Sequence, residues 1–174
     1  MQNKILMVVA QDKFRDEEFE IPYKEFIKND FKVDIASSRR GKCKGSQGME
    51  IKANKSLEEV NAENYDAVVI VGGQGAKNLV GNKELIKLLK DSGMLNKIIA
   101  AICYSPVILA RAGLLKNRHA TVWNGDNLQK QVFDEEGVIY EEKEVVADGR
   151  IITANGPAAA LEFARTIISM LNKS

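Results

Sequence analysis

The chain has few of the residues from which metal sites and disulfide frameworks are built. Its 174 residues include one histidine and two cysteines, Cys43 and Cys103, far apart in the sequence. Two cysteines with this spacing are too few for a disulfide framework or a four-ligand zinc site. We therefore expect no metal and no other cofactor, and each cysteine has to be considered singly.

An excess of charge of either sign is also missing. The chain has 25 Lys and Arg residues against 24 Asp and Glu residues, a formal net charge of +1. Proteins that bind nucleic acid or anionic membranes carry a basic surface, so we expect neither partner. The first ten residues lack the apolar segment and cleavage site of a signal peptide, and this predicts a cytoplasmic protein.

Apolar runs alternate with helical segments along the whole chain, whose length fits one domain over residues 1–174. This order is typical of a doubly wound α/β fold, in which a mostly parallel sheet lies between two layers of helices. A late hairpin with Asp148–Gly149 at its turn predicts an antiparallel edge. The expected strands are 4–10, 32–36, 67–71 and 97–102, the expected helices are 19–30, 83–95, 107–112 and 157–171, the hairpin is 138–152, and 41–52 is a loop or small hairpin.

In open sheets of this kind, ligands bind beyond the carboxyl ends of the strands. One such end carries Cys103, which follows the apolar run of residues 97–102 and precedes Pro106. Proline suits the first turn of a helix, so Cys103 is expected at a sharp strand-to-helix corner. Unpaired amides and the helix dipole there favour a thiolate, which predicts a lowered pKa and a nucleophilic sulfur. The alternative is a buried cysteine that only packs against its neighbours.

Two more strand ends carry chemical signals. Gly72 and Gly73 follow residues 67–71, and paired glycines let backbone N–H groups approach a ligand closely, although a tight turn without a ligand gives the same pattern. After residue 10, Pro22 predicts a helix that is interrupted or kinked next to Glu18, which aims this carboxyl across the strand ends. Burial beside a thiolate would raise the pKa of Glu18. The neighbouring acids Asp16, Glu17 and Glu20 are interpreted as solvent-facing residues of a helix start.

Four stretches together resemble the DJ-1/PfpI (ThiJ/PfpI) family, whose flavodoxin-like fold is related to class I glutamine amidotransferases. They are "EEFEIP", "YDAVVIVGGQGAKNL", "IIAAICYSPVILARAGLL" and "NGPAAALEFARTIISML", in the expected order over most of the chain. The resemblance implies that Cys103 is the elbow cysteine, that Glu18 is the carboxyl beside it, and that Gly73 and Tyr104 supply backbone amides. It further implies a homodimer or larger homo-oligomer and a pocket lined by Gly72, Trp123, Asn155 and Gly156.

The sequence departs from the family pattern at the histidine. Family members of the peptidase type place a histidine directly after the cysteine, where this chain has Tyr104. DJ-1-like members place one at the position of Trp123, whereas the single histidine here is His119. A cysteine nucleophile needs either a neighbouring base or a thiol that its surroundings have already ionised. Without a histidine at the expected positions, the sequence indicates only an already ionised thiol. His119 is expected on the surface, and Cys43 is expected to have no catalytic role.

Two functions follow from the resemblance. In the first, Cys103 adds to a reactive carbonyl in a stress-related, glyoxalase- or deglycase-like reaction, with Glu18 moving protons and the amides of Gly73 and Tyr104 stabilising an oxyanion. A peptidase acting on peptide substrates is disfavoured, because expelling an amine requires a good general acid. In the second, a redox-sensing or chaperone-like stress protein uses oxidation of Cys103 to sulfinic acid as its signal, without turnover.

Overall fold

The structure is a computed structural model that describes residues 2–174. Seven strands form its central sheet: β1 (Lys4–Val8), β3 (Lys32–Ser37), β6 (Lys55–Ser56), β7 (Ala67–Ile70), β8 (Ile98–Ile102), β11 (Val145–Asp148) and β12 (Ile151–Ala154). The helices are α1 (Asp16–Lys28), α2 (Lys83–Met94), α3 (Pro106–Arg111), α4 (Leu128–Glu135) and α5 (Ala160–Asn172). Short 3-10 helices are η1 (Leu57–Glu59), η2 (Ala62–Asn64), η3 (Gln74–Leu79) and η4 (Pro157–Ala159).

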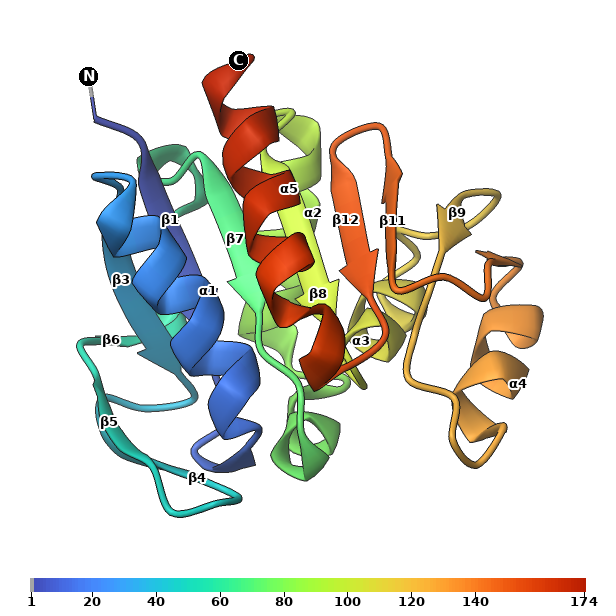
Figure 1. The fold of residues 1–174 in the computed structure, drawn as a ribbon, viewed down its shortest axis with the longest axis horizontal. Coiled ribbons are helices and arrows are strands. Elements are labelled where there is room, and N and C mark those ends of the chain that lie inside the picture. Colours follow the sequence, from blue (N-terminus) through green and yellow to red (C-terminus); the bar gives the residue numbers. More distant parts are fainter. Residues whose placement is uncertain (1) are drawn as a thin grey trace.

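The central sheet has the strand order β11-β12-β8-β7-β1-β3-β6 (Figure 1). All neighbouring strands are parallel except β11 and β12, which form an antiparallel hairpin at one edge. Two small sheets accompany it, one of β2 (Asp12–Phe14), β4 (Gly41–Gly45) and β5 (Glu50–Ala53), the other of β9 (His119–Ala120) and β10 (Ile139–Tyr140). The predicted doubly wound α/β fold with an antiparallel edge is confirmed.

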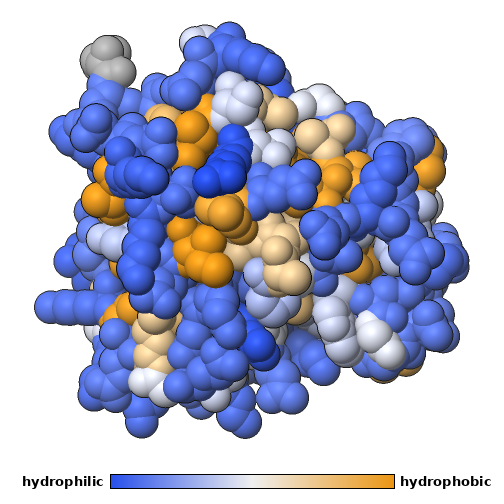
Figure 2. Space-filling model, viewed as in Figure 1, coloured by the Kyte–Doolittle hydropathy of each residue, from blue (hydrophilic) through white to orange (hydrophobic). Residues whose placement is uncertain are grey.

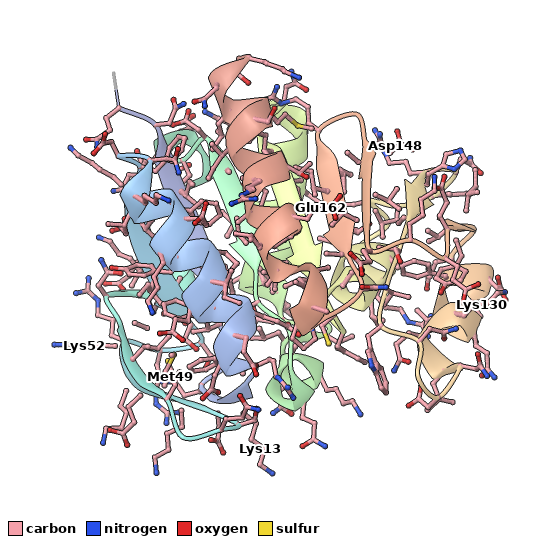
Figure 3. All side chains as sticks on the ribbon, viewed as in Figure 1. Lys13, Met49, Lys52, Lys130, Asp148 and Glu162 are labelled. Carbon is pink, nitrogen blue, oxygen red and sulfur yellow. The ribbon has the colours of Figure 1, made fainter. Side chains whose placement is uncertain are left out.

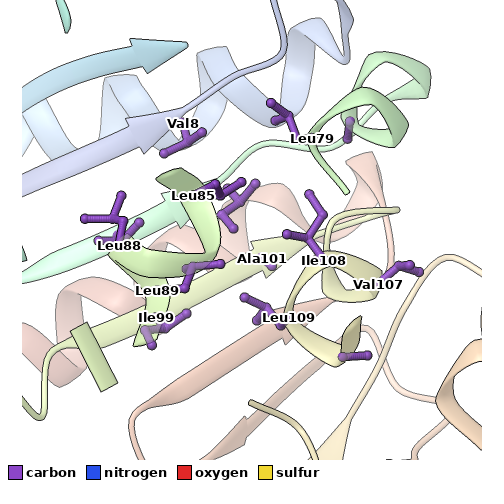
Figure 4. Packing of buried hydrophobic residues seen from close by; sticks show 14 of the residues in the cluster. Val8, Leu79, Leu85, Leu88, Leu89, Ile99, Ala101, Val107, Ile108 and Leu109 are labelled. Atoms are coloured by element: carbon purple, nitrogen blue, oxygen red, sulfur yellow. The ribbon is translucent and has the colours of Figure 1, made fainter. Parts of the chain in front are cut away.

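Helices cover both faces of the sheet, with α1 and α5 in front of it in Figure 1 and α2 and α3 behind. Successive residues of β8 point to opposite faces, so Ile98 packs in the core under α1 and α5 while Ile99 packs in the core under α2 and α3. Figure 4 shows Leu89 of α2 and Leu109 of α3 beside Ile99. Burial on both faces explains why the strands read as unbroken apolar runs.

Helix α1 differs from its prediction. It begins at Asp16 and continues through Pro22 to Lys28 without interruption. A proline inside a helix removes its own N–H bond to the carbonyl four residues earlier, here that of Glu18. Phe19 and Phe26 are buried against the sheet side of α1, and this packing stabilises the helix on either side of the proline.

The hairpin predicted over 138–152 lies later in the chain. It is formed by β11 and β12, and Gly149 at its turn has φ +59°, as the Asp148–Gly149 pair suggests. The prediction began too early because Ile139 and Tyr140 pair in parallel with His119 and Ala120 in the separate two-stranded sheet. The glycine-rich segment 41–52 contains an antiparallel hairpin, β4 with β5.

The chain reverses direction across the sheet at β1. From β1 it goes to β3 on one side and later to β7 on the other, so the carboxyl ends of β1, β7 and β8 lie at one edge. This edge is the topological switch point, where open α/β sheets bind ligands.

The face formed by α1 and α5 is mostly hydrophilic, with small groups of apolar side chains among the polar ones (Figure 2). Ile27 of α1 and Leu161 of α5 are among the exposed apolar residues of the molecule. None of the helices within residues 2–174 combines the length and the apolar character that a membrane crossing requires.

The packing of α5 can be tested with two residues of that helix. Phe163 is fully buried, whereas Leu161 is 39% exposed. We expect Phe163→Ala to lower the free energy of unfolding by about 3–5 kcal/mol, because it leaves a cavity under the helix, and Leu161→Ala to lower it by less than about 1 kcal/mol. Urea denaturation of both variants measures this difference, and equal losses would contradict the burial of Phe163.

Candidate active site

Cys103 lies at a sharp corner directly after β8. Its φ is +64°, in the left-handed region that residues with a Cβ rarely adopt. The backbone N–H of Cys103 donates to the carbonyl of Ala154 at 2.9 Å, and its carbonyl accepts the N–H of Trp123 at 2.8 Å. Pro106 begins α3, as the sequence predicts. Bonds from two other segments therefore hold the corner in its strained conformation.

The glycines after β7 allow three segments to meet at the sulfur. The N–H of Gly72 donates to Oε2 of Glu18 at 3.0 Å. A Cβ on Gly72 would lie 2.3 Å from that oxygen and 2.6 Å from the Cβ of Cys103. Gly73 has φ +105°, and a Cβ there would lie 2.5 Å from the backbone nitrogen of Arg15. A side chain at either glycine would clash with neighbouring atoms, so only glycine fits in this turn. The absence of a side chain at Gly72 also lets Glu18 lie close to Cys103.

Two backbone amides point at the sulfur. The N–H groups of Gly73 and Tyr104 lie close to the sulfur of Cys103, and their dipoles lower the pKa of the thiol. These are the two amides that the resemblance assigned to the site. They offer preorganised dipoles for negative charge on the sulfur or on an atom bonded to it.

Glu18 reaches the site from the first turn of α1 and is fully buried. Oε2 accepts the N–H of Gly72, while the other carboxyl oxygen, Oε1, is buried and has no hydrogen-bond partner among residues 2–174. Burial raises the pKa of Glu18 to about 7, and contacts with the Cys103 thiol and the Gly72 amide only partly offset this effect. Because Oε2 is occupied by a donor, Oε1 is the oxygen that can carry the proton without losing a hydrogen bond.

The thiol itself behaves differently from the sequence-based expectation. Burial, together with the negative charge and close contact of the Glu18 carboxyl, raises the pKa of Cys103 to about 12, and the two amides offset only part of this rise. The expected lowering is therefore wrong, because loss of solvent around the sulfur outweighs the amide dipoles. The sulfur keeps its proton at neutral pH until a neighbouring base accepts it.

Glu18 is placed to be that base. With a pKa of about 7 it is half ionised near neutral pH, and the thiol lies directly beside its carboxyl. A carboxylate with this pKa can accept the thiol proton as the sulfur forms a new bond. Glu18 is therefore the candidate base of a site whose histidine positions hold other residues.

Cys103 lies at a cleft of about 490 Å³ beyond the strand ends. Of the predicted site residues, Glu18, Gly73, Cys103, Tyr104 and Trp123 line it together. Gly72 packs beneath, between Glu18 and Cys103. The remaining lining residues are Arg15, Ser46, Gln74, Lys77, Asp126 and Pro157.

Asn155 and Gly156, predicted to line the pocket, are not in the lining, where the next residue, Pro157, takes their place. The N–H of Asn155 donates to the carbonyl of Glu144, which holds this segment against the chain before β11. Gln74 directly follows the two glycines, so its position in the sequence places it near the strand ends. No such signal marks Ser46, because loop residues follow no hydrophobic period.

Asp16 also has a role that the sequence analysis missed. It is 8% exposed, and its carboxylate accepts the N–H groups of Gln47 at 3.1 Å and Met49 at 3.0 Å. These amides belong to the turn between β4 and β5, and Figure 3 shows Met49 on this hairpin beside α1. Asp16 therefore fixes the hairpin whose turn places Ser46 in the cleft.

The other candidate side chains lie away from the cleft. His119 is exposed, and its Nδ1 lies 2.6 Å from a carboxyl oxygen of Glu141. Cys43 is fully buried in the apolar core of β4, where burial raises its pKa. No group of three or more His, Cys, Asp or Glu side chains within residues 2–174 is arranged to hold a metal ion.

A model of the DJ-1/PfpI family matches residues 3–170. The chain belongs to this family. An uncharacterised protein of Methanocaldococcus jannaschii is 42% identical to it over 98% of this chain and 83% of its own length. The DJ-1/PfpI member named deglycase PfpI, from Pyrococcus furiosus, is 30% identical, covering 97% and 99% of the two chains.

Two further comparisons extend the family likeness. A protein named glutathione-independent glyoxalase, from Caenorhabditis elegans, is 28% identical over 98% of this chain and 89% of its own. The crystal structure of a ThiJ/PfpI domain protein from Brachyspira murdochii superimposes with a TM-score of 0.95 at 31% identity, covering 99% and 98% of the two chains. The DJ-1/PfpI fold extends over nearly the whole chain.

The raised pKa of Glu18 predicts how stability depends on pH. In the unfolded chain this carboxyl loses its proton near pH 4.5, but in the folded protein only near pH 7. Its contribution to stability is therefore fully present below pH 4.5 and is lost as pH rises through 7, a fall of roughly 3 kcal/mol. Urea denaturation between pH 4.5 and 8 measures this slope. Glu18→Gln should flatten it, and an unchanged slope in that variant would contradict the assignment.

The pairing of base and thiol predicts a pH profile for alkylation of Cys103. In a Cys43→Ala background, the rate with iodoacetamide should rise with an apparent pKa of about 7, because ionised Glu18 accepts the thiol proton. In Glu18→Gln the step near pH 7 should vanish, and the rate should rise only at alkaline pH. A step that persists near pH 7 in Glu18→Gln would show that another group activates the sulfur.

Proposed function

We propose that this protein is a glyoxalase- or deglycase-like enzyme that acts on small reactive carbonyl compounds and serves in a stress response. The contact that supports this most directly is that of the buried Glu18 carboxyl with the Cys103 thiol, at an open cleft and beneath two backbone N–H groups. The names of two relatives, a deglycase and a glutathione-independent glyoxalase, point to the same chemistry.

The reaction begins when the sulfur of Cys103 attacks the aldehyde carbon of a 2-oxoaldehyde. As the C–S bond forms, the thiol proton moves to Oε1 of Glu18, the oxygen without a partner. Glu18 then passes this proton to the new alkoxide oxygen, which gives a hemithioacetal and leaves the carboxyl ionised again. The amides of Gly73 and Tyr104 stabilise negative charge, first on the sulfur and then on the neighbouring oxygen.

Turnover requires a further proton transfer. Glu18 removes the proton from the carbon that bears the sulfur, and a proton returns to the adjacent carbonyl carbon through an enediol, which leaves a 2-hydroxy thioester. Water then cleaves the thioester and releases a 2-hydroxy acid and the free thiol. The sum is one 2-oxoaldehyde plus one water giving one 2-hydroxy acid, with no external oxidant or cofactor.

Peptidase chemistry has less support. Departure of an amine needs a proton donor on the leaving-group side of the cleft. The residue after the nucleophile is Tyr104, and the single histidine, His119, is exposed and paired with Glu141 outside the cleft lining. Glu18 is the one group of the lining with a pKa raised to near neutrality, and it lies against the sulfur.

The resemblance also leads us to propose a cytoplasmic homodimer or larger homo-oligomer. Exposed apolar side chains on α1 and α5, including Ile27 and Leu161, would supply apolar surface for association. Helices α1 and α5 lie in front of the sheet in the view that Figures 1 and 2 share.

Methylglyoxal turnover tests the proposed function. We expect formation of lactate by the native protein, complete loss in Cys103→Ser, and a loss of 100-fold or more in Glu18→Gln, as is usual when a general base is removed. Cys43→Ala is the matched control and should keep the activity. If the native protein shows no turnover and mild peroxide adds two oxygens to Cys103, the redox-sensing alternative replaces this proposal.

A further inference from the structure

Tyr104 stands where related peptidases have a histidine, and its side chain holds a cation. The Nζ of Lys77, from η3, lies 5.6 Å from the centroid of the Tyr104 ring. An ammonium group at this distance over an aromatic face is attracted by the ring's electron density. Both residues line the cleft beside Cys103.

Lys77 is the cation of this cleft whose charge is not neutralised. The other cation in the lining, Arg15, pairs with Glu17, with 2.7 Å between Nε and Oε2. Lys77 is exposed, and its Nζ forms no ion pair with an acidic side chain anywhere in residues 2–174. Its one partner is the Tyr104 ring, which holds the ammonium group in place and leaves its N–H donors free.

The two acidic groups of the lining, Glu18 and Asp126, form no ion pair with Lys77. Glu18 is buried below the sulfur and stays protonated below pH 7. Asp126 also lines the cleft, and its Oδ1 accepts the N–H of Leu128 at 3.1 Å within its own loop. Burial raises the pKa of Tyr104, and the negative charge of Asp126 adds to this rise. The ammonium group of Lys77 is therefore a cation of the lining that is available to an anionic group of a ligand.

We propose that Lys77, positioned by the ring of Tyr104, selects carbonyl compounds that also carry an anionic group, either a carboxylate or a phosphate. The proposal rests on the function assigned above to Cys103 and narrows its substrate class. Tyr104 then has two roles in the site. Its backbone N–H lies close to the sulfur. Its ring positions Lys77, which binds the anionic group of the substrate. Because Lys77 is exposed, such a charge pair weakens as the salt concentration rises.

Two substrate pairs test the selection. The 2-oxoaldehydes 4,5-dioxopentanoate and 2-oxopentanal differ by a carboxylate, and 3-phosphooxy-2-oxopropanal and 3-hydroxy-2-oxopropanal differ by a phosphate. For each pair, the ratio of kcat/KM for the anion to that for the neutral compound should fall about tenfold in Lys77→Met, mainly through KM. Lys77→Arg should restore it, because arginine keeps the charge and also stacks on tyrosine. Whichever pair responds more strongly identifies the anionic group that the site prefers.

The matched control is Lys83→Met, which removes an equal charge from an exposed position of α2 outside the cleft lining. It should leave the ratio at the native value. The proposal is overturned if Lys77→Met changes the anionic and neutral compounds equally, or if Lys83→Met gives the same loss as Lys77→Met.

Binding without turnover separates this proposal from the proposed function. In Cys103→Ala no covalent adduct forms, and Trp123, the single tryptophan of the chain, reports occupancy of the cleft by its fluorescence. The Kd of 4,5-dioxopentanoate or 3-phosphooxy-2-oxopropanal should rise about tenfold with Lys77→Met and also rise with Tyr104→Leu. If the native protein turns over no carbonyl compound but this pattern of binding is found, the enzymatic proposal fails and the anion site stands. If Kd is insensitive to Lys77, the anion site fails alone.

Discussion

The site depends on one energetically unfavourable arrangement, a carboxyl group buried against a thiol. In water, Glu18 would be ionised at neutral pH, but in the fold it keeps its proton up to about pH 7 because no solvent reaches it. Bringing the two groups together requires that the residue between them has no side chain, and Gly72 meets this requirement. The corner at Cys103 adds a second cost, a left-handed backbone that neighbouring segments hold in place.

These costs are tolerated because they are concentrated at one edge of an otherwise regular sheet. Three parallel strands, β1, β7 and β8, end there, with side chains packed on both faces. Their rigidity fixes the segments that follow them. The loops after β7 and β8 and the start of α1 then meet over a few ångströms, each contributing a different group: amides, a sulfur and a carboxyl. A scaffold of this kind lets reactive geometry be strained locally without destabilising the whole fold.

Much of this could be predicted from the sequence, because buried parallel strands and strand ends leave clear patterns. The runs that became β1, β7 and β8 were recognisable, and so were the corner at Cys103 and the approach of Glu18. The thiol pKa was predicted in the wrong direction, since desolvation depends on what covers the sulfur, and that covering comes from distant segments. Asp16 and Lys77 were missed for a related reason. Their partners, the β4–β5 turn and the Tyr104 ring, are adjacent only after folding.

The first turn of α1 limits how the length of the preceding connection can change. Asp16 and Glu18 are two positions apart, so their side chains leave the helix about 200° from each other, one toward the β4–β5 hairpin and one toward the sulfur. A single insertion or deletion between Phe14 and Asp16 would rotate the helix start by about 100° and misdirect both at once. The length of this short connection is therefore under stricter constraint than the identity of most residues in it.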